Sequence, residues 1–222
     1  MDKLSSDTRL NPLLAFLVRT LLRPRVYYLD PERKDEVLSE PSILVCNHTG
    51  HLDGGVINTA LLPQRIHTLA AKDRFEQRGF GFFLRHTGCI PIDRQHADTS
   101  WIHDSLKTLH NDHEHVAIYP EGRHGEHRRQ LPFHPGVTML TTMANVPLVL
   151  VYLDGPVRFF RRNKIMVAPP FRLEPPTEGM TSEYITKQTH LLEEKMKELM
   201  DSFIDLTETP DQVRGDGISR RA

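Results

Sequence analysis

The chain has 222 residues, enough for one compact domain with a sizeable hydrophobic core. Its 28 Lys and Arg residues nearly balance its 29 Asp and Glu residues, which argues against a generally basic nucleic-acid binder and against an acidic disordered chain. Two cysteines are too few for a disulfide framework or a cysteine-rich zinc site.

The N-terminal part predicts a short apolar helix at residues 12–22 (PLLAFLVRTLL), followed by two arginines and two tyrosines within residues 23–28. An apolar helix flanked by arginine and aromatic residues suits a membrane interface. Packing of the same helix against the domain is the alternative. No apolar stretch reaches the roughly 20 residues that span a bilayer. We therefore expect residues 1–30 to associate with a membrane, and the protein to sit at its cytoplasmic face as a peripheral or monotopic protein.

From residue 42 onward, short apolar runs alternate with helical patterns. Strands are expected at residues 42–46, 68–71, 89–92, 116–119 and 148–153, with an edge strand at 165–167. Helices are expected at residues 53–62, 74–86, 98–110, 135–145 and 182–204. This alternation predicts a single α/β domain, whose mostly parallel sheet is flanked by helices. We assign residues 31–206 to this domain and expect residues 207–222, which lack an apolar period, to be a disordered tail.

A histidine and an aspartate follow the first buried strand directly. His48 and Asp53 are separated by four residues, so a turn and the start of a helix can bring the carboxylate back to the imidazole. The aspartate would then fix the histidine tautomer and leave the other ring nitrogen as a general base. A loop histidine beside a helix-capping aspartate is the alternative interpretation of this pair alone.

Three further segments occur at the ends or starts of predicted strands: residues 88–94 (GCIPIDR), 119–123 (YPEGR) and 146–151 (VPLVLV). Because functional groups in open α/β sheets gather at the carboxyl ends of strands, one pocket can collect their polar side chains. The ordered set resembles the glycerolipid acyltransferase family, which includes the 1-acylglycerol-3-phosphate (lysophospholipid) acyltransferases. That family shows His-x4-Asp, a Gly-x-Ile-x-Ile-Asp-Arg-like block, Phe-Pro-Glu-Gly-Thr-Arg-Ser and a Pro-led apolar strand in the same order.

The resemblance implies a role for each matching residue. His48 looks like the general base and Asp53 like its orienting partner. Arg94 matches the arginine that holds the phosphate of the acceptor, an anion that a guanidinium fork suits well. The other matches are substrate-binding residues: Glu121 and Gly122 as the acceptor-site pair, and Pro147 in the block associated with the acyl donor and the pocket wall.

The third block departs from the family pattern. Where the family usually continues Thr-Arg-Ser after Glu-Gly, this chain has Arg123, His124 and Gly125, so the arginine comes one residue early. Arg123 is a further predicted substrate-binding residue: it reaches the same anion from a shifted loop, or the acceptor differs.

The resemblance also implies a reaction. A fatty acyl group would move from an acyl thioester, either acyl-CoA or acyl-ACP, to the free hydroxyl of a lysophospholipid, with 1-acylglycerol 3-phosphate as the best match and phosphatidic acid as the product. Direct attack by the hydroxyl needs no acyl-enzyme, which agrees with the absence of a Gly-x-Ser-x-Gly sequence. No metal ion or organic cofactor is required. The expected partners are the two substrates and a membrane surface, with no nucleic acid.

Two alternatives to this enzyme stay open. His48, His51 and Asp53 can be read as the ligands of a metal-dependent hydrolase, and the altered third block fits a non-catalytic membrane lipid-binding protein. Residues 157–164 (VRFFRRNK) combine basic and aromatic side chains, which suits an anionic lipid surface, single-stranded nucleic acid or a plain solvated loop. We favour the lipid surface because of the acyltransferase-like blocks.

Overall fold

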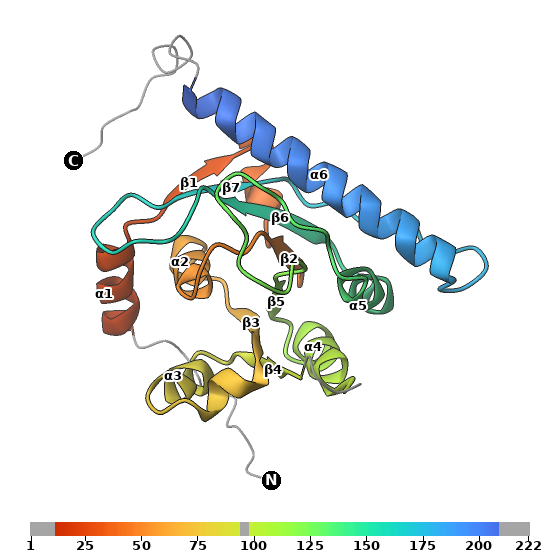
Figure 1. Cartoon of the computed structure of the whole chain (residues 1–222), viewed down its shortest axis with the longest axis horizontal. Coiled ribbons are helices and arrows are strands. Elements are labelled where there is room, and N and C mark those ends of the chain that lie inside the picture. The colour runs from red at the N-terminus through yellow and green to blue at the C-terminus, as the bar shows by residue number, and fades with distance from the viewer. Residues whose placement is uncertain (1–11, 94–97, 209–222) are drawn as a thin grey trace.

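The computed structural model describes residues 12–93 and 98–208, which form a seven-stranded sheet with helices on both faces (Figure 1). The strand order is β1-β7-β6-β2-β5-β3-β4. Every pairing between these strands is parallel except that of β6 with β7. The prediction of a single α/β domain with a mostly parallel sheet is therefore confirmed. The strands are β1 (Arg25–Tyr28), β2 (Ile43–Cys46), β3 (Ile66–Ala71), β4 (Ile90–Ile92), β5 (His115–Ile118), β6 (Leu148–Leu153) and β7 (Lys164–Val167).

The helices divide between two hydrophobic cores, one on each face of the sheet. The C-terminal half of α1 and the body of α2 pack on one face of the sheet, and α4, α5 and α6 pack on the other. The longest helix, α6, runs across the molecule (Figure 1). The helices are α1 (Pro12–Leu22), α2 (Asp53–Ala60), α3 (Phe80–His86), α4 (Ser100–His110), α5 (Gly136–Ala144) and α6 (Ser182–Glu208), with the 3-10 helices η1 (Pro31–Glu36) and η2 (Lys72–Glu76).

The central strand β2 shows why the sheet was visible in the sequence. Ile43 and Val45 point into the core under α4, α5 and α6, whereas Leu44 and Cys46 point into the core under α1 and α2. A strand that is covered on both faces needs apolar residues at every position, so it reads as a continuous apolar run. The same logic gives α6 its stripe, because Leu192, Met196, Leu199 and Phe203 recur at helical spacing and are all buried.

The strand predicted at residues 165–167 is present as β7, but the prediction that it lies at an edge of the sheet was wrong. This strand, β7, lies between β1 and β6 and is almost completely buried. The edge on this side of the sheet is β1, a four-residue strand whose arginine and tyrosines were interpreted from the sequence as a membrane flank. Tyr27 of β1 packs edge-on against Phe203 of α6, with ring centroids 5.7 Å apart. Part of the segment 1–30 therefore belongs to the sheet of the domain.

The predicted helix at residues 74–86 is two helices. The 3-10 helix η2 ends at Glu76, and α3 begins at Phe80 after Gly79, whose φ of 80° is left-handed. A Cβ at Gly81 would lie 2.1 Å from the carbonyl oxygen of Phe75, so only glycine allows the two helices to approach this closely. The break lets α3 pack closely against η2.

None of the helices in the described residues is long and apolar enough to cross a membrane. The C-terminal helix α6 continues to Glu208, two residues past the boundary expected at 206. Residues 1–11, 94–97 and 209–222 lie outside the described residues, and with them the predicted phosphate-binding Arg94 and nearly all of the predicted tail.

Candidate active site

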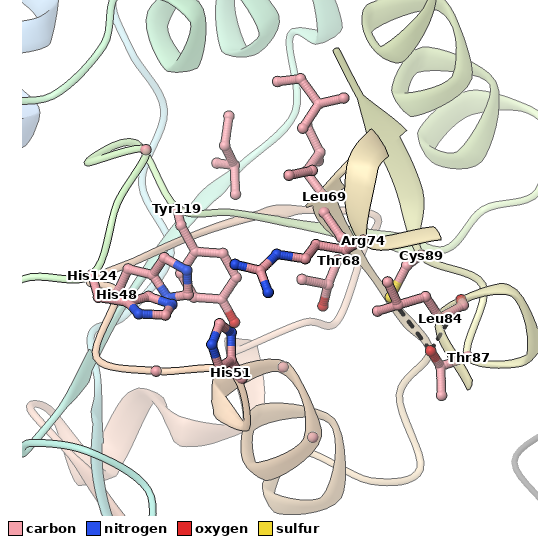
Figure 2. A pocket seen from close by; sticks show the side chains of 18 of the residues that line it. His48, His51, Thr68, Leu69, Arg74, Leu84, Thr87, Cys89, Tyr119 and His124 are labelled. Atoms are coloured by element: carbon pink, nitrogen blue, oxygen red, sulfur yellow. Dashed lines mark hydrogen bonds between the residues drawn. The ribbon is translucent and has the colours of Figure 1, made fainter. Parts of the chain in front are cut away.

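The polar segments after β2 and β5 meet at the mouth of a cavity of about 590 Å³. Its polar end is formed by His48 and His51 from the loop after β2, and by Tyr119 and His124 from the loop after β5 (Figure 2). Since β2 and β5 are neighbours in parallel register, their carboxyl ends lie at the same edge of the sheet. The cavity therefore occupies the position at which open α/β sheets bind ligands.

His48 and Asp53 form a hydrogen-bonded pair in this mouth. The Nδ1 atom of His48 lies 2.8 Å from Oδ2 of Asp53, whose side chain is 1% exposed. The backbone N–H groups of Thr49 and Gly50 donate to the same Oδ2 atom at 2.6 and 2.9 Å, and the Thr49 hydroxyl donates to Oδ1 at 2.8 Å. A carboxylate held by these donors offers only acceptors to the imidazole, so Nδ1 carries the proton. The other ring nitrogen, Nε2, is left as a proton acceptor.

Two further residues hold the backbone of the His48 loop. The side-chain amide of Asn47 donates to the carbonyl of Leu153 at 3.0 Å and accepts its N–H at 2.7 Å, which ties the end of β2 to the end of β6. The N–H of Gly125 donates to the carbonyl oxygen of His48 at 2.7 Å. The first and third polar blocks are thus connected directly, and the orientation of His48 depends on both.

Glu121 lies beneath this loop rather than in the cavity. Glu121 is 4% exposed, and the nearby backbone N–H groups of His48 and Leu131 act to lower the pKa of its carboxyl. Burial, followed by the negative charge of Asp53, raises the pKa of Glu121 to about 7. A Cβ at Gly125 would come within 2.8 Å of its Oε2 atom, so a larger residue there would push this carboxylate aside. The geometry gives Glu121 a role in positioning the His48 loop, where the resemblance implied contact with the acceptor.

The remaining predicted residues fall in three different places. Gly122 and Arg123 line the cavity beside His48, and Gly122 has a left-handed φ of 65°. Pro147 precedes β6 and accepts the N–H of Ile43 through its carbonyl, which puts it at the amino edge of the sheet. That edge is opposite to His48, so the structure does not bring Pro147 into the pocket wall. Arg94 is outside the described residues.

Aromatic rings surround His48. Tyr119 stacks on its imidazole with centroids 4.5 Å apart, and His124 packs against it edge-on at 4.3 Å. His51 packs edge-on against His124 from the other side at 4.6 Å. Burial, and then the neighbouring His48 and His51, lower the pKa of His124. A neutral His124 fills the position where the resembling family has an arginine, so this chain lacks a fixed cation there.

The far end of the cavity is apolar. Its walls come from β3, α3, β4, α4, β5 and α5, with these large side chains: Leu69, Phe80, Phe83, Leu84, Ile92, Trp101, Ile118 and Val137. Val18 of α1 also lines the cavity. A cavity that is lined mainly by apolar side chains and carries polar groups beside His48 fits a molecule with a polar head and a hydrocarbon chain.

The metal-dependent alternative receives no support from the geometry. Across residues 12–93 and 98–208, no group of three or more His, Cys, Asp and Glu side chains is arranged to hold a metal ion. The oxygen of Asp53 that His48 contacts is already bonded to the backbone of Thr49 and Gly50. Cys46 is fully buried, and burial raises the pKa of its thiol well above the usual range, as expected for a small core residue.

Sequence reasoning missed three residues that line the polar part of the cavity. Arg74 enters from η2 on the opposite wall, Thr68 comes from β3, and Tyr119 stacks on His48 (Figure 2). Tyr119 could have been found, because it stands where the resembling block has phenylalanine. Arg74 and Thr68 carry no such signal, since their place in the cavity depends on how η2 and β3 pack in three dimensions.

Comparisons with known proteins point to one family. A family model described as Acyltransferase matches residues 25–154. The chain is 26% identical over 162 residues to the 1-acyl-sn-glycerol-3-phosphate acyltransferase of Bacillus subtilis (strain 168), covering 71% of this chain and 80% of that protein. It is 25% identical over 193 residues to the human 1-acyl-sn-glycerol-3-phosphate acyltransferase beta, covering 82% and 66% respectively. The crystal structure of the 1-acyl-sn-glycerophosphate (LPA) acyltransferase PlsC from Thermotoga maritima has a TM-score of 0.60 at 17% identity, covering 86% of this chain and 79% of that one, and shows the shared fold.

Proposed function

This chain belongs to the acyltransferase family, and from that premise we propose that it moves a fatty acyl group from an acyl thioester to the free hydroxyl of a lysophospholipid. The best candidate acceptor is 1-acylglycerol 3-phosphate, with phosphatidic acid as the product. One observation carries the proposal: the hydrogen-bonded His48–Asp53 pair stands at the polar mouth of a cavity whose lining is mainly apolar.

The geometry of the pair supports direct transfer. The Nε2 atom of His48 takes the proton of the acceptor hydroxyl while the hydroxyl oxygen attacks the thioester carbonyl carbon. The tetrahedral intermediate then collapses, the C–S bond breaks, and the proton passes from His48 to the leaving thiolate. Asp53 stabilises the imidazolium that exists between these two proton transfers, since its carboxylate lies 2.8 Å from Nδ1. Two substrates and one base account for all atoms, and no acyl-enzyme is needed.

The apolar part of the cavity would take an acyl chain. A volume of about 590 Å³ is within the range of roughly 300–1,000 Å³ for small-molecule sites. Burial of hydrocarbon contributes about 0.8 kcal/mol for each CH₂ group, so a long chain supplies most of the binding free energy. The reacting carbonyl or hydroxyl would then lie at the polar end, beside His48.

We also propose that the acceptor phosphate binds among cations at the mouth. Arg123 is exposed and lines the cavity, which supports a role in holding this anion from the shifted loop. Arg94 keeps the role that the resemblance implies for it. A neutral His124 leaves the phosphate to these neighbours.

The surface around the cavity rim supports attachment to a membrane. Phe16 and Leu17 of α1, and Phe82 of α3, are largely exposed. The loop 155–163 joins this surface, because the N–H of Phe160 donates to the carbonyl of Leu21 at 2.7 Å and Asn163 bonds to Leu22. The loop adds two exposed phenylalanines and three exposed arginines: Phe159, Phe160, Arg158, Arg161 and Arg162. Apolar and basic groups together favour anionic lipid, each arginine by about 1 kcal/mol.

A panel of acceptors tests the proposal. The purified protein is given one acyl thioester, as the CoA or ACP form, together with 1-acylglycerol 3-phosphate, lysophosphatidylcholine, monoacylglycerol or water alone, and the lipids are identified by mass spectrometry. We expect phosphatidic acid as the main product. Release of free fatty acid in every reaction would indicate a hydrolase. Binding of 1-acylglycerol 3-phosphate without any product would support the non-catalytic lipid-binding alternative.

A further inference from the structure

Two hydroxyl groups in the cavity wall have no hydrogen-bond partner among the described residues. The Tyr119 hydroxyl and the Thr68 hydroxyl are both closed off from solvent. Thr68, which is 7% exposed, pairs in register with Ala117, and Tyr119 follows two residues later, so both side chains lie on the same face of the sheet. A buried hydroxyl without a partner costs about 1–3 kcal/mol. These groups mark a place in the wall where a bound molecule with acceptor oxygens would restore the missing hydrogen bonds.

Burial and nearby negative charge keep the Tyr119 hydroxyl protonated. Desolvation, then the charges of Cys46 and Asp53, raise the pKa of Tyr119 well above its usual range. The group therefore stays a hydrogen-bond donor at every physiological pH. In this conformation solvent does not reach it, so a ligand that bonds it must displace the side chains that cover it.

Arg74 supplies a cation in the same region. It extends from η2 across the cavity toward Tyr119 and His124 (Figure 2). In the described part of the chain its ion pair is a long one, 3.8 Å to the exposed Asp73, so most of its donors are available. Its positive charge contributes to lowering the pKa of His124. Arg74 and Arg123 line the same cavity from different elements, so the two guanidinium groups can hold one anion together.

We propose that Arg74, with the hydroxyls of Tyr119 and Thr68, forms an anion subsite that holds the terminal phosphate of the acceptor next to His48. This inference rests on the proposed function and makes it narrower. Arg74, Tyr119 and Thr68 all line the same cavity as His48. A phosphate monoester ends in three acceptor oxygens and fits between Arg74 and the wall. A phosphodiester carries a further head group there, so the chain selects monoester acceptors.

Kinetics with three variants and a matched control test this subsite. Charge-assisted hydrogen bonds of this kind correspond to roughly 10- to 150-fold in affinity. Arg74→Ala should therefore raise the KM for 1-acylglycerol 3-phosphate by about that factor, leave the KM for the acyl thioester nearly unchanged, and alter monoacylglycerol acylation little. Arg74→Lys should recover part of the loss, because lysine keeps the charge without the fork. Tyr119→Phe keeps the ring on His48 and should raise the same KM by about 10-fold.

The control is Arg78→Ala, since Arg78 is exposed on the same segment and does not line the cavity. Binding is followed in parallel by the fluorescence of Trp101, the single tryptophan, which lines the cavity. A rise in the thioester KM alone would assign Arg74 to the donor and overturn the subsite. Equal losses for phosphate and neutral acceptors, or an Arg78→Ala variant that behaves like Arg74→Ala, would overturn it too. A wild-type protein that acylates no acceptor would instead defeat the proposed function, and this inference with it.

Discussion

Asp53→Asn separates the charge of this residue from its hydrogen bonds. Three donors converge on Oδ2, namely Nδ1 of His48 and the N–H groups of Thr49 and Gly50. A backbone N–H can only donate a hydrogen bond, so the asparagine must place its carbonyl oxygen at the position of Oδ2. Its NH₂ group then takes the place of Oδ1 and donates to the Thr49 hydroxyl, which can rotate to accept. The variant should keep its fold and hold His48 in the same tautomer.

The expected loss of activity follows from the charge alone. A carboxylate that stabilises an imidazolium at 2.8 Å is worth about 1.5–3 kcal/mol, so kcat should fall roughly 10- to 150-fold. A wrong tautomer would instead cost roughly 10⁴-fold. The free energy of unfolding should fall by only about 1 kcal/mol, because all the hydrogen bonds remain in weaker form.

Initial rates at saturating substrate and urea unfolding measure the two effects. Asp53→Ala is the matched comparison, since it leaves the buried donors of Thr49 and Gly50 unpaired and should lose about 1–3 kcal/mol more stability for each. In a His48→Ala background, Asp53→Asn should cost nothing further, because the two residues act as one unit. Full activity of Asp53→Asn, or an unchanged cost without His48, would refute the assignment of the pair.

Three other changes probe the surroundings of the site. The folded-state pKa of Glu121 is raised from 4.5 to about 7, so stability should fall as pH rises through this interval. Glu121→Gln should remove this loss of unfolding free energy, which amounts to about 3 kcal/mol at most and is measured by urea unfolding at several pH values. An unchanged dependence of the unfolding free energy on pH would contradict the burial of this carboxyl. Gly122→Ala should lower the free energy of unfolding by about 1–2 kcal/mol, because φ is 65° at this position and the new Cβ would lie 2.8 Å from His134. An unchanged thermal unfolding curve would show that alanine is not strained there. Replacing Phe159 and Phe160 with serine should reduce the fraction of protein that floats with anionic vesicles, and high salt should reduce the remaining binding further. Unchanged flotation would show that another surface contacts the membrane.

Local patterns of apolar residues were enough to predict the strands and helices whose burial follows a regular period along the chain. The strand Ile43–Cys46 is covered on both faces and the helix Ser182–Glu208 on one, and each produces its own period in the sequence. The spacing of His48 and Asp53 was informative for the same reason, since the end of a strand and the start of a helix fix their separation. The structure places these side chains 2.8 Å apart.

Features that depend on distant parts of the chain were not predictable. The strand Arg25–Tyr28 is half-exposed and pairs with Lys164–Val167, so neither segment shows by itself which of them is the edge. The sequence did not predict that Arg74 lines the cavity, because its position depends on the close packing of η2 against α3 at Gly81. Pro147 was expected in the pocket from its order among the blocks, yet it opens a strand, which puts it at the other edge of the sheet.

The most direct test of the central claim is the rate of phosphatidic acid formation from 1-acylglycerol 3-phosphate and an acyl thioester, measured for the wild type and for His48→Ala. Loss of a general base costs roughly 10²–10⁴-fold, and His48 is a loop residue outside both hydrophobic cores, so the variant should unfold like the wild type. We expect a rate at least about 100-fold lower in a folded protein. Near-normal formation of phosphatidic acid by folded His48→Ala would contradict the account.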